Sequence, residues 1–304
     1  MAEIGQQLVV VLLVLGITFA GPGAAIVLLL RRKAVSRAAR RSPLTENLLR
    51  APGHSLREKL EDLRSEVGFD VTVLMVVPNL LLALYLLQLQ FRHLPPSMWV
   101  NVVLAALCVG VIGHFIRGLL RRSAEMDKLR KGLDAEVAVG QELDQLMRQG
   151  AVVFHDFQAE KFNIDHVVIA PQGVFCVETK GYTKALGDDG AAAARVKFDG
   201  RVLSFPGWQT SKPLEQAERN AQWLAKWLSS ATGTEMSVIP VVALPGWFVD
   251  RKGRGTVRVF SGRELPSLLK AGTPNALSAD KIQRAVHQVE QRCRDVKPTY
   301  RREG

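Results

Sequence analysis

The sequence predicts an α/β domain, built on a mixed sheet flanked by helices, that follows an α-helical membrane region with three spans. Mean hydropathy is slightly positive although 23% of the residues are charged, so apolar residues must be concentrated in segments. Three long apolar segments lie before residue 122. From about Glu125 onward, helix-like and strand-like patterns follow one another, which is typical of an α/β domain.

The predicted spans cover residues 8–30, 71–89 and 98–120. The first has no charged residue, and a helix rising about 1.5 Å per residue would cross a hydrocarbon layer of about 30 Å. A cleaved signal peptide is the competing interpretation, but residues 1–7 lack a positive segment and the apolar run is too long. The second and third spans are joined by a short connection, which predicts a helical hairpin.

The charge distribution predicts the orientation of these spans. Residues 1–130 hold 16 Lys and Arg against 9 Asp and Glu, whereas residues 131–304 hold 24 against 20. Most of the net charge of +11 therefore flanks the spans, as the positive-inside rule describes. We expect a multi-pass protein of the cytoplasmic membrane, with the lipid bilayer as partner, the N-terminus outside and the C-terminal domain in the cytoplasm. The basicity alone is weak evidence for nucleic-acid binding.

The predicted boundaries are a membrane region at residues 1–122, a domain at 125–245, and a strand and helix extension with a basic tail at 246–304. Between the first two spans, Ser55 with Glu58 matches a capping box, and a short amphipathic cytoplasmic helix is predicted at 55–67. The three cysteines are odd in number and match no zinc or disulfide spacing.

Within the domain, the patterns predict a helix ending near Gly150, followed by strands and further helices. Pro171, Gln172 and Gly173 indicate a tight turn between two strands, with Gly173 at a positive φ, and Asp199-Gly200 indicates the two-residue turn of a second hairpin. The remaining predicted elements are a strand at 152–157, hairpin strands at 162–170 and 174–179, a hairpin at 196–205, a helix at 214–228, strands at 238–244 and 257–260, and helices at 263–270 and 280–292.

The residues that could carry chemistry lie on the first hairpin. Asp165 and Glu178 occupy consecutive strands, so their carboxylates can converge on one cation at the strand ends. Mg²⁺ prefers oxygen ligands and keeps several waters, and the carbonyl of Thr179 is a candidate third ligand. Lys180 shares a strand face with Glu178, where its ammonium could orient or help deprotonate a metal-bound water. On spacing alone, solvent-exposed charge would also explain this pattern.

Three motifs taken together are more specific than the Asp165, Glu178 and Lys180 spacing alone. They are Gly-Leu-Asp-Ala-Glu at 132–136, Asn-Ile-Asp-His at 163–166, and Gly-Val-Phe-Cys-Val-Glu-Thr-Lys at 173–180. Over roughly residues 128–245 the chain resembles the NERD, or nuclease-related, domain, a branch of the PD-(D/E)XK nuclease-like superfamily. The resemblance implies a restriction-endonuclease-like core, a metal-dependent nuclease, and Mg²⁺ or Mn²⁺ as cofactor.

The resemblance also implies roles that spacing could not assign. Glu136 resembles the helical acidic residue of the superfamily, which would join Asp165, Glu178 and Thr179 at the metal. Gln216, with Asn220 one turn later, resembles the Gln-bearing helix that approaches the site. The expected catalytic residues are Asp165, Glu178, Lys180, Glu136 and Gln216. His166 is expected to point to the opposite strand face and make a structural hydrogen bond.

The leading hypothesis is a membrane-anchored nuclease that hydrolyses phosphodiester bonds of nucleic acid, with DNA as the expected substrate. A catalytically silent module that recruits nucleic acid or a protein to the membrane is the alternative. A third reading places the function in the spans, which lack the paired charges of transporters. A homodimer would suit an enzyme that cuts both strands, and the choices of DNA or RNA and of endo- or exonuclease stay open.

Overall fold

The computed structural model describes residues 9, 16, 20, 21, 23–35, 43–91, 97–184, 194–271 and 276–298. The chain divides into two compact units, one containing residues 61–127 and the other combining residues 46–60 with 128–297. The first predicted span, residues 8–30, lies partly outside the described residues, and its described part at 23–30 belongs to a helical stretch that continues to 35.

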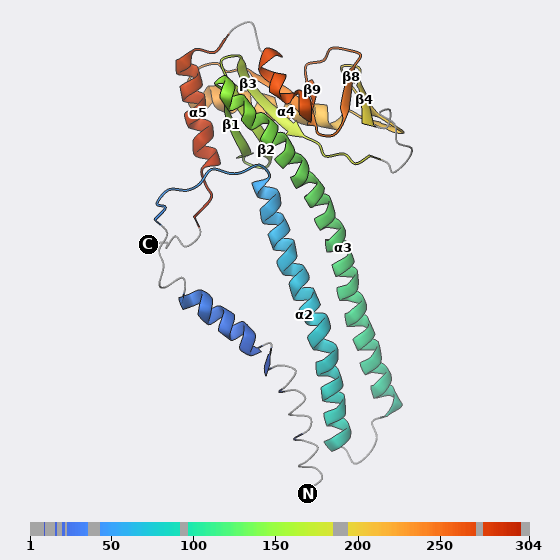
Figure 1. Cartoon of the computed structure of the whole chain (residues 1–304). Helices are drawn as coiled ribbons and strands as arrows, with labels where there is room; N and C mark the ends of the chain where they lie inside the picture. The colour runs from blue at the N-terminus through green and yellow to red at the C-terminus, as the bar shows by residue number, and fades with distance from the viewer. Residues whose placement is uncertain are drawn as a thin grey trace. The chain divides into compact units, whose positions relative to one another are not determined.

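Two long helices dominate the N-terminal part of the described chain: α2 (His54–Phe91) and α3 (Met98–Asp144) (Figure 1). By length and composition alone, both are long and apolar enough to cross a membrane. The helix predicted at 55–67 and the span predicted at 71–89 are parts of the single helix α2. In the same way α3 joins the third predicted span to the first helix of the domain. Residues 121–131 contain good helix formers and neither glycine nor proline, so nothing breaks the helix there.

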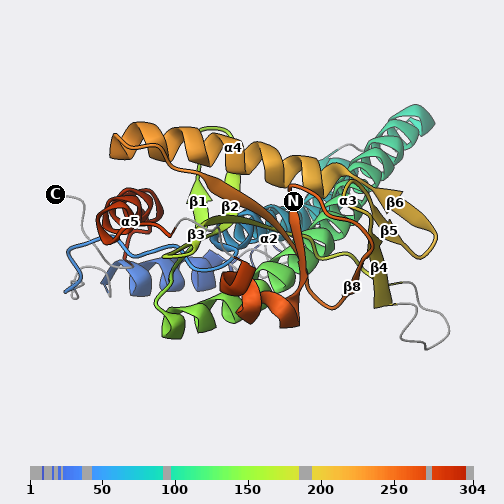
Figure 2. The same ribbon diagram turned by 90° about the horizontal axis from the view of Figure 1, so that it is seen from above.

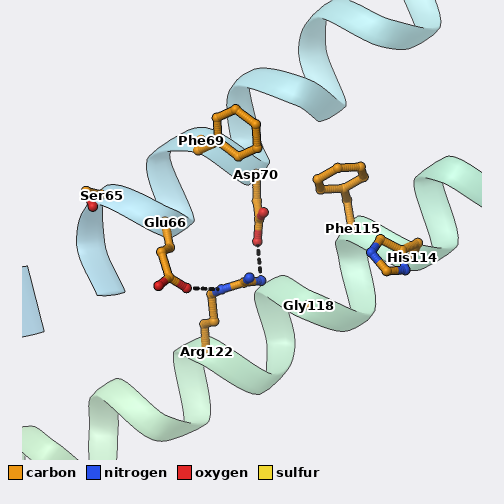
Figure 3. A pocket seen from close by; sticks show the side chains of 8 residues that line it. All are labelled: Ser65, Glu66, Phe69, Asp70, His114, Phe115, Gly118 and Arg122. Carbon is orange, nitrogen blue, oxygen red and sulfur yellow. Dashed lines mark hydrogen bonds and ion pairs between the residues drawn. The ribbon is translucent and has the colours of Figure 1, made fainter. Parts of the chain in front are cut away.

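An ion-pair cluster joins α2 to α3 within the first unit. Arg122 Nε donates to Glu66 at 2.8 Å, and Arg122 Nη1 donates to Asp70 at 2.7 Å (Figure 3). Asp70 is buried, with 3% of its surface exposed. Gly118 lies beside the guanidinium, and a Cβ there would stand 2.7 Å from Arg122 Nη1. A pocket of about 340 Å³ adjoins the cluster, with Phe69, His114 and Phe115 among its lining residues.

The second unit is built on a five-stranded mixed sheet in the order β1-β2-β3-β7-β9. β1, β2 and β3 are antiparallel neighbours, whereas β7 runs parallel to both β3 and β9. Ala170 pairs with Gly173, so Pro171 and Gln172 form a two-residue turn, and Gly173 has the predicted positive φ. The strands are β1 (Val152–Gln158), β2 (Asn163–Ala170), β3 (Gly173–Thr179), β7 (Val238–Leu244) and β9 (Arg258–Ser261).

A smaller four-stranded sheet has the order β6-β5-β4-β8. Phe198 pairs with Leu203, so the predicted hairpin exists but its turn has four residues instead of two. The Asp199 carboxylate accepts hydrogen bonds from the backbone N–H groups of Arg201 and Val202, which stabilises this longer turn. The strands are β4 (Arg195–Phe198), β5 (Leu203–Phe205), β6 (Trp208–Thr210) and β8 (Phe248–Arg251).

Helices cover both faces of the five-stranded sheet (Figure 2). Val174 and Cys176 point toward α4 (Lys212–Thr232) and α5 (Ala279–Cys293), because successive strand residues alternate between faces. Phe175 and Val177 point the other way and pack with the C-terminal turns of α3 and two 3₁₀ helices, η1 (Gln145–Gln149) and η3 (Gly262–Ala271). The α/β fold with mixed sheets flanked by helices is therefore as predicted.

Candidate functional site

The first hairpin brings Asp165 and Glu178 together at the ends of β2 and β3. His166 pairs with Val177, so extending the register by one residue sets Asp165 opposite Glu178. Asp165 Oδ2 also accepts a hydrogen bond of 2.6 Å from the backbone N–H of Thr179. Both carboxylates lie on the α4 face of the sheet, as the alternation of β2 and β3 requires. The convergence inferred from the hairpin pattern is present.

Glu178 is the centre of a small hydrogen-bond network. Its side chain is almost fully buried, with 2% of the residue exposed. Lys180 Nζ donates to Glu178 Oε1 at 2.6 Å, and Asn220 Nδ2 donates to Glu178 Oε2 at 3.0 Å. Burial raises the pKa of Glu178, although Lys180, Asn220 and Arg219 each act in the opposite direction. The amide that contacts the acidic residues is therefore Asn220, on α4.

Gln216 lies one turn earlier on α4 and is half-buried. Within the part of the chain that the structure describes, no hydrogen bond joins Gln216 to Asp165, Glu178 or Lys180. A helix turn of 3.6 residues brings positions 216 and 220 to nearly the same face, so a sequence pattern separates them poorly. Of the two amides, only Asn220 is also buried, with 6% exposed.

Glu136, on α3, lies close enough to the other acids to interact with them electrostatically. Burial raises its pKa to about 7, and the charges of Asp156 and Glu178 add to the effect. Burial together with Glu178 and Glu136 likewise raises the pKa of Asp165 well above its ordinary value. The charge of Glu178 therefore disfavours ionisation of both Glu136 and Asp165, and a cation would stabilise such a group of acids.

Cations surround these acids. For Lys180, burial by itself would lower the pKa, but Glu178 and Asp165 outweigh it and the pKa is raised, so the side chain is an ammonium at neutral pH. The charge of Lys59 lowers the pKa of Glu136, and the charge of Arg219 lowers the pKa of Glu178. Both of these residues are exposed. The site thus has one buried carboxylate, Glu178, and two half-buried ones, Asp165 and Glu136, with exposed basic side chains near them, an arrangement that suits a polyanion.

Asp156, an acid inside the apolar strand β1, has a role that its sequence context did not predict. It is buried and has the positive φ of 51°, rare for a residue other than glycine. Asp156 Oδ2 accepts from Arg50 Nη1 at 2.7 Å, from Ser55 Oγ at 2.7 Å and from the Ser55 backbone N–H at 2.8 Å. Asn163 donates to its other oxygen. A charge within an apolar strand was the only local signal, and it does not identify partners about a hundred residues away.

This network attaches residues 46–60 to the domain. Leu48 and Val296 form a β-bridge, and Arg50 also donates two hydrogen bonds to Asp295. Ser55 is occupied with Asp156 and Asn163, so it does not form the capping box predicted with Glu58. Asn163 of the Asn-Ile-Asp-His motif therefore has a structural role. The start of α2 contributes to the surroundings of Glu136, although it precedes the predicted domain.

His166 points away from Asp165, to the opposite face of β2, and makes the expected structural hydrogen bond. Its Nδ1 lies 2.9 Å from His155 Nδ1, and His155 Nε2 lies 3.0 Å from Asp144 Oδ1. Burial lowers the pKa of both imidazoles, and His155 lowers that of His166 further. If neutral His155 donates to Asp144, its Nδ1 must accept from His166. The pair belongs to the fold and not to the acidic site.

The acidic residues offer oxygen donors of the kind that a divalent metal binds. Asp165 and Glu178 supply the hard oxygens that Mg²⁺ and Mn²⁺ bind. Among the described residues, no three His, Cys, Asp or Glu side chains form a ready metal cage. Mg²⁺ commonly uses one or two carboxylates and retains waters, so this pair fits such an ion by its chemistry. Lys180 and Asn220 occupy the oxygens of Glu178 that a metal would need.

Comparison with known protein families agrees with this geometry. Residues 131–245 match the family described as NERD, nuclease-related domain. No curated protein and no solved structure matched the chain. The matched residues contain Glu136, Asp165, Glu178, Lys180 and Asn220, which the fold brings to one region. The resemblance inferred from the sequence is confirmed, and residues 131–245 of this chain are a NERD, or nuclease-related, domain.

Proposed function

We propose that this chain is a membrane-anchored, metal-dependent nuclease that hydrolyses phosphodiester bonds of nucleic acid, DNA in particular, at the cytoplasmic face. The observation that carries the proposal is the convergence of Asp165, Glu178 and Lys180 inside a nuclease-related domain. Exposed basic residues near the buried and half-buried acids support a polyanionic substrate.

Each residue has a role in this proposal. Asp165 and Glu178 would hold a Mg²⁺ or Mn²⁺ ion, with Glu136 and the carbonyl of Thr179 as further oxygen donors. A bound divalent ion supplies an acidified water and neutralises charge on the phosphate. Lys180 is protonated in its raised-pKa environment, so it stabilises negative charge on a phosphate oxygen and orients the attacking water instead of deprotonating it. Asn220 holds Glu178 in position.

The test is a cleavage assay on the full chain in detergent micelles with plasmid, linear duplex, single-stranded DNA and RNA. We expect Asp165→Asn and Lys180→Met to lower the rate by about 100-fold or more, as loss of one charge-stabilising group commonly does. Glu160→Gln and Lys226→Met are matched controls, because both residues are exposed and neither takes part in the hydrogen bonds of Asp165 and Glu178. A chelator should abolish cleavage, and added Mg²⁺ or Mn²⁺ should restore it.

One observation favours a second candidate, a silent module that binds nucleic acid without cutting. Both oxygens of Glu178 are already hydrogen-bonded, and the described residues contain no ready three-residue metal cage. This candidate predicts binding that survives Asp165→Asn and no products at any metal concentration. Cleavage by a folded wild type that is lost in both site variants would exclude it.

The membrane part of the proposal rests on α2 and α3, whose apolar stretches suffice to cross a bilayer. The positive flanks at residues 31–41 and 121–131 support a cytoplasmic C-terminal domain. Protease treatment of right-side-out and inverted membrane vesicles tests it. A C-terminal tag should be degraded only in inverted vesicles, and release of the protein by alkaline carbonate would contradict the anchor.

A further inference from the structure

An aromatic group lies immediately beyond Lys180 in the chain. Tyr182 follows Lys180 by two residues, a separation of at most about 7 Å along an extended chain. The segment is held in place because the Lys180 N–H donates to the Ala243 carbonyl at 3.0 Å and Trp247 Nε1 donates to the Tyr182 carbonyl at 3.0 Å. Gly181 packs closely on α3, where a Cβ would meet Ala135 at 2.7 Å. Tyr182 is therefore fixed beside the site.

The small sheet adds a second ring to this group. The ring centroids of Tyr182 and Trp208 are 4.9 Å apart, with an interplanar angle of 76°. Phe205 stacks against Trp208 at 4.2 Å and 8°, and Phe205 itself is buried. Trp208 nevertheless keeps 42% of its surface exposed. Since Phe205 covers one face of the indole, the exposed area belongs to the other face and the edges.

We propose that Trp208, stacked on Phe205 and contacted by Tyr182 at a steep angle, forms an aromatic shelf that stacks a nucleobase of single-stranded nucleic acid next to the phosphodiester at Lys180. This rests on the proposed nuclease function and specifies its substrate class. Aromatic side chains bind single strands because each base has a π-face, and they do so without sequence preference. In a duplex both faces of a base are covered by neighbouring pairs, so the shelf selects single strands or splayed ends.

Electrostatics agrees with the placement of the shelf. Burial raises the pKa of the Tyr182 hydroxyl. The charge of Lys180 lowers this pKa and the charge of Glu178 raises it, so both charged groups act on the hydroxyl. Lys184 continues the same segment, is exposed, and lies 5.8 Å above the ring of Trp247. A strand that places its scissile phosphate at Lys180 and a base on Trp208 can therefore place a neighbouring phosphate near Lys184.

The test measures binding and cleavage separately with full-length protein in detergent. Fluorescence anisotropy of labelled oligonucleotides, in chelator, compares single-stranded DNA, single-stranded RNA and duplex. Trp208→Leu keeps apolar cover over Phe205 but removes the π-face, and Trp208→Tyr keeps an aromatic face. Phe248→Ala is the matched control, because Phe248 is the other exposed aromatic of this sheet, 57% exposed, and pairs with Arg195 on a different strand.

We expect Trp208→Leu to weaken single-strand binding by about 5- to 150-fold, Trp208→Tyr to retain most of it, and Phe248→Ala to match the wild type. Duplex affinity should change little in any variant. The proposal is overturned if the wild type binds single strands no better than duplex, or if Trp208→Leu and Phe248→Ala behave alike.

These results are distinguishable from failure of the nuclease proposal. Metal-dependent cleavage that is indifferent to Trp208→Leu overturns the shelf and keeps the nuclease. Single-strand binding that depends on Trp208 without any cleavage supports the shelf and overturns the nuclease. The DNA and RNA arms show which polynucleotide supplies the base.

Discussion

At the scale of the residue, the site depends on how a few buried charges are balanced. Glu178 stays in an apolar sheet because Lys180 and Asn220 each satisfy one of its oxygens. A buried carboxylate oxygen without a donor costs free energy, so each partner of Glu178 makes a measurable contribution to the free energy of unfolding. Lys180 provides Glu178 with a positive charge as well as a hydrogen bond, whereas Asn220 provides only a hydrogen bond that holds the carboxylate in position. Substitution of each residue separates the two effects.

Asn220→Ala should lower the free energy of unfolding by about 1–3 kcal/mol, because it leaves Glu178 Oε2 without its donor. Gln216→Ala, one turn earlier on the same helix, should change it by no more than about 0.5 kcal/mol. Denaturant unfolding of both variants, followed by tryptophan fluorescence, makes the comparison. Equal losses would mean that Gln216 supports the site as the sequence pattern had suggested.

Protonation of the buried histidines should cost stability in mild acid. The pKa of His155 is lowered by burial, although Asp144 acts against this, so the folded state disfavours the imidazolium. A lowered folded pKa means that stability is complete above the unfolded pKa of about 6.5 and is lost as pH falls toward the folded value. Each pKa unit between the two states corresponds to about 1.4 kcal/mol.

The raised pKa values of Glu136, Asp165 and Glu178 act in the opposite direction in both proteins, so the test is the difference between them. Between pH 8 and pH 5, denaturant unfolding should show His155→Gln gaining stability relative to the wild type. His287→Gln provides a histidine control on α5, since position 287 is not part of the buried pair. A pH dependence that His155→Gln leaves unchanged would assign the loss to other groups.

At the scale of the element, α2 and α3 depend on one polar cluster for their alignment. Arg122 holds both Glu66 and Asp70 across the helix pair, and Gly118 leaves room for its guanidinium (Figure 3). The Asp70 side chain is 5% exposed and Arg122 is 32% exposed, so this pair is screened less than an ordinary surface pair.

Asp70→Ala should destabilise the hairpin by about 1–3 kcal/mol, less than loss of a fully buried pair, because Arg122 keeps Glu66 and partial solvent contact. Glu61→Gln, at an exposed position of α2, is the matched control. Thermal unfolding in detergent micelles, followed by helical circular dichroism, gives the difference. If Asp70→Ala unfolds at the same temperature as the control, the ion-pair cluster does not determine the alignment of α2 with α3.

In the fold as a whole, the features that could be predicted from the sequence are those formed by residues close together in the chain. The Pro171-Gln172-Gly173 turn determines the hairpin, and the hairpin brings Asp165 to Glu178. Features that join distant segments were missed. The Arg50–Asp156 contact spans 106 positions, and no periodicity links its two residues. The continuity of α2 and α3 was missed for a different reason, since apolar and polar stretches were assigned to separate helices although no residue breaks the backbone between them.

The second compact unit is built from two separate stretches of chain, residues 46–60 and 128–297, and its stability should depend on both. The Arg50 and Asp156 side chains are 10% and 4% exposed, and removing one partner of such a buried pair costs roughly 3–5 kcal/mol. Residues 128–297 alone would leave Asp156 without Arg50 and Ser55 and would uncover Gly140, which packs on Pro52.

A chimera that links residues 46–60 to 128–297 through a flexible linker should therefore be more stable than 128–297 alone by about that amount. Arg50→Gln in the chimera should remove most of the gain because it leaves the Asp156 charge uncompensated, whereas Arg57→Gln, the same substitution at an exposed position of the same segment, should keep it. Denaturant midpoints of the four soluble proteins decide the matter. If the linked segment adds no stability, the start of α2 is only a tether; if it adds the expected amount, the nuclease-related domain is completed by residues that precede its own family match.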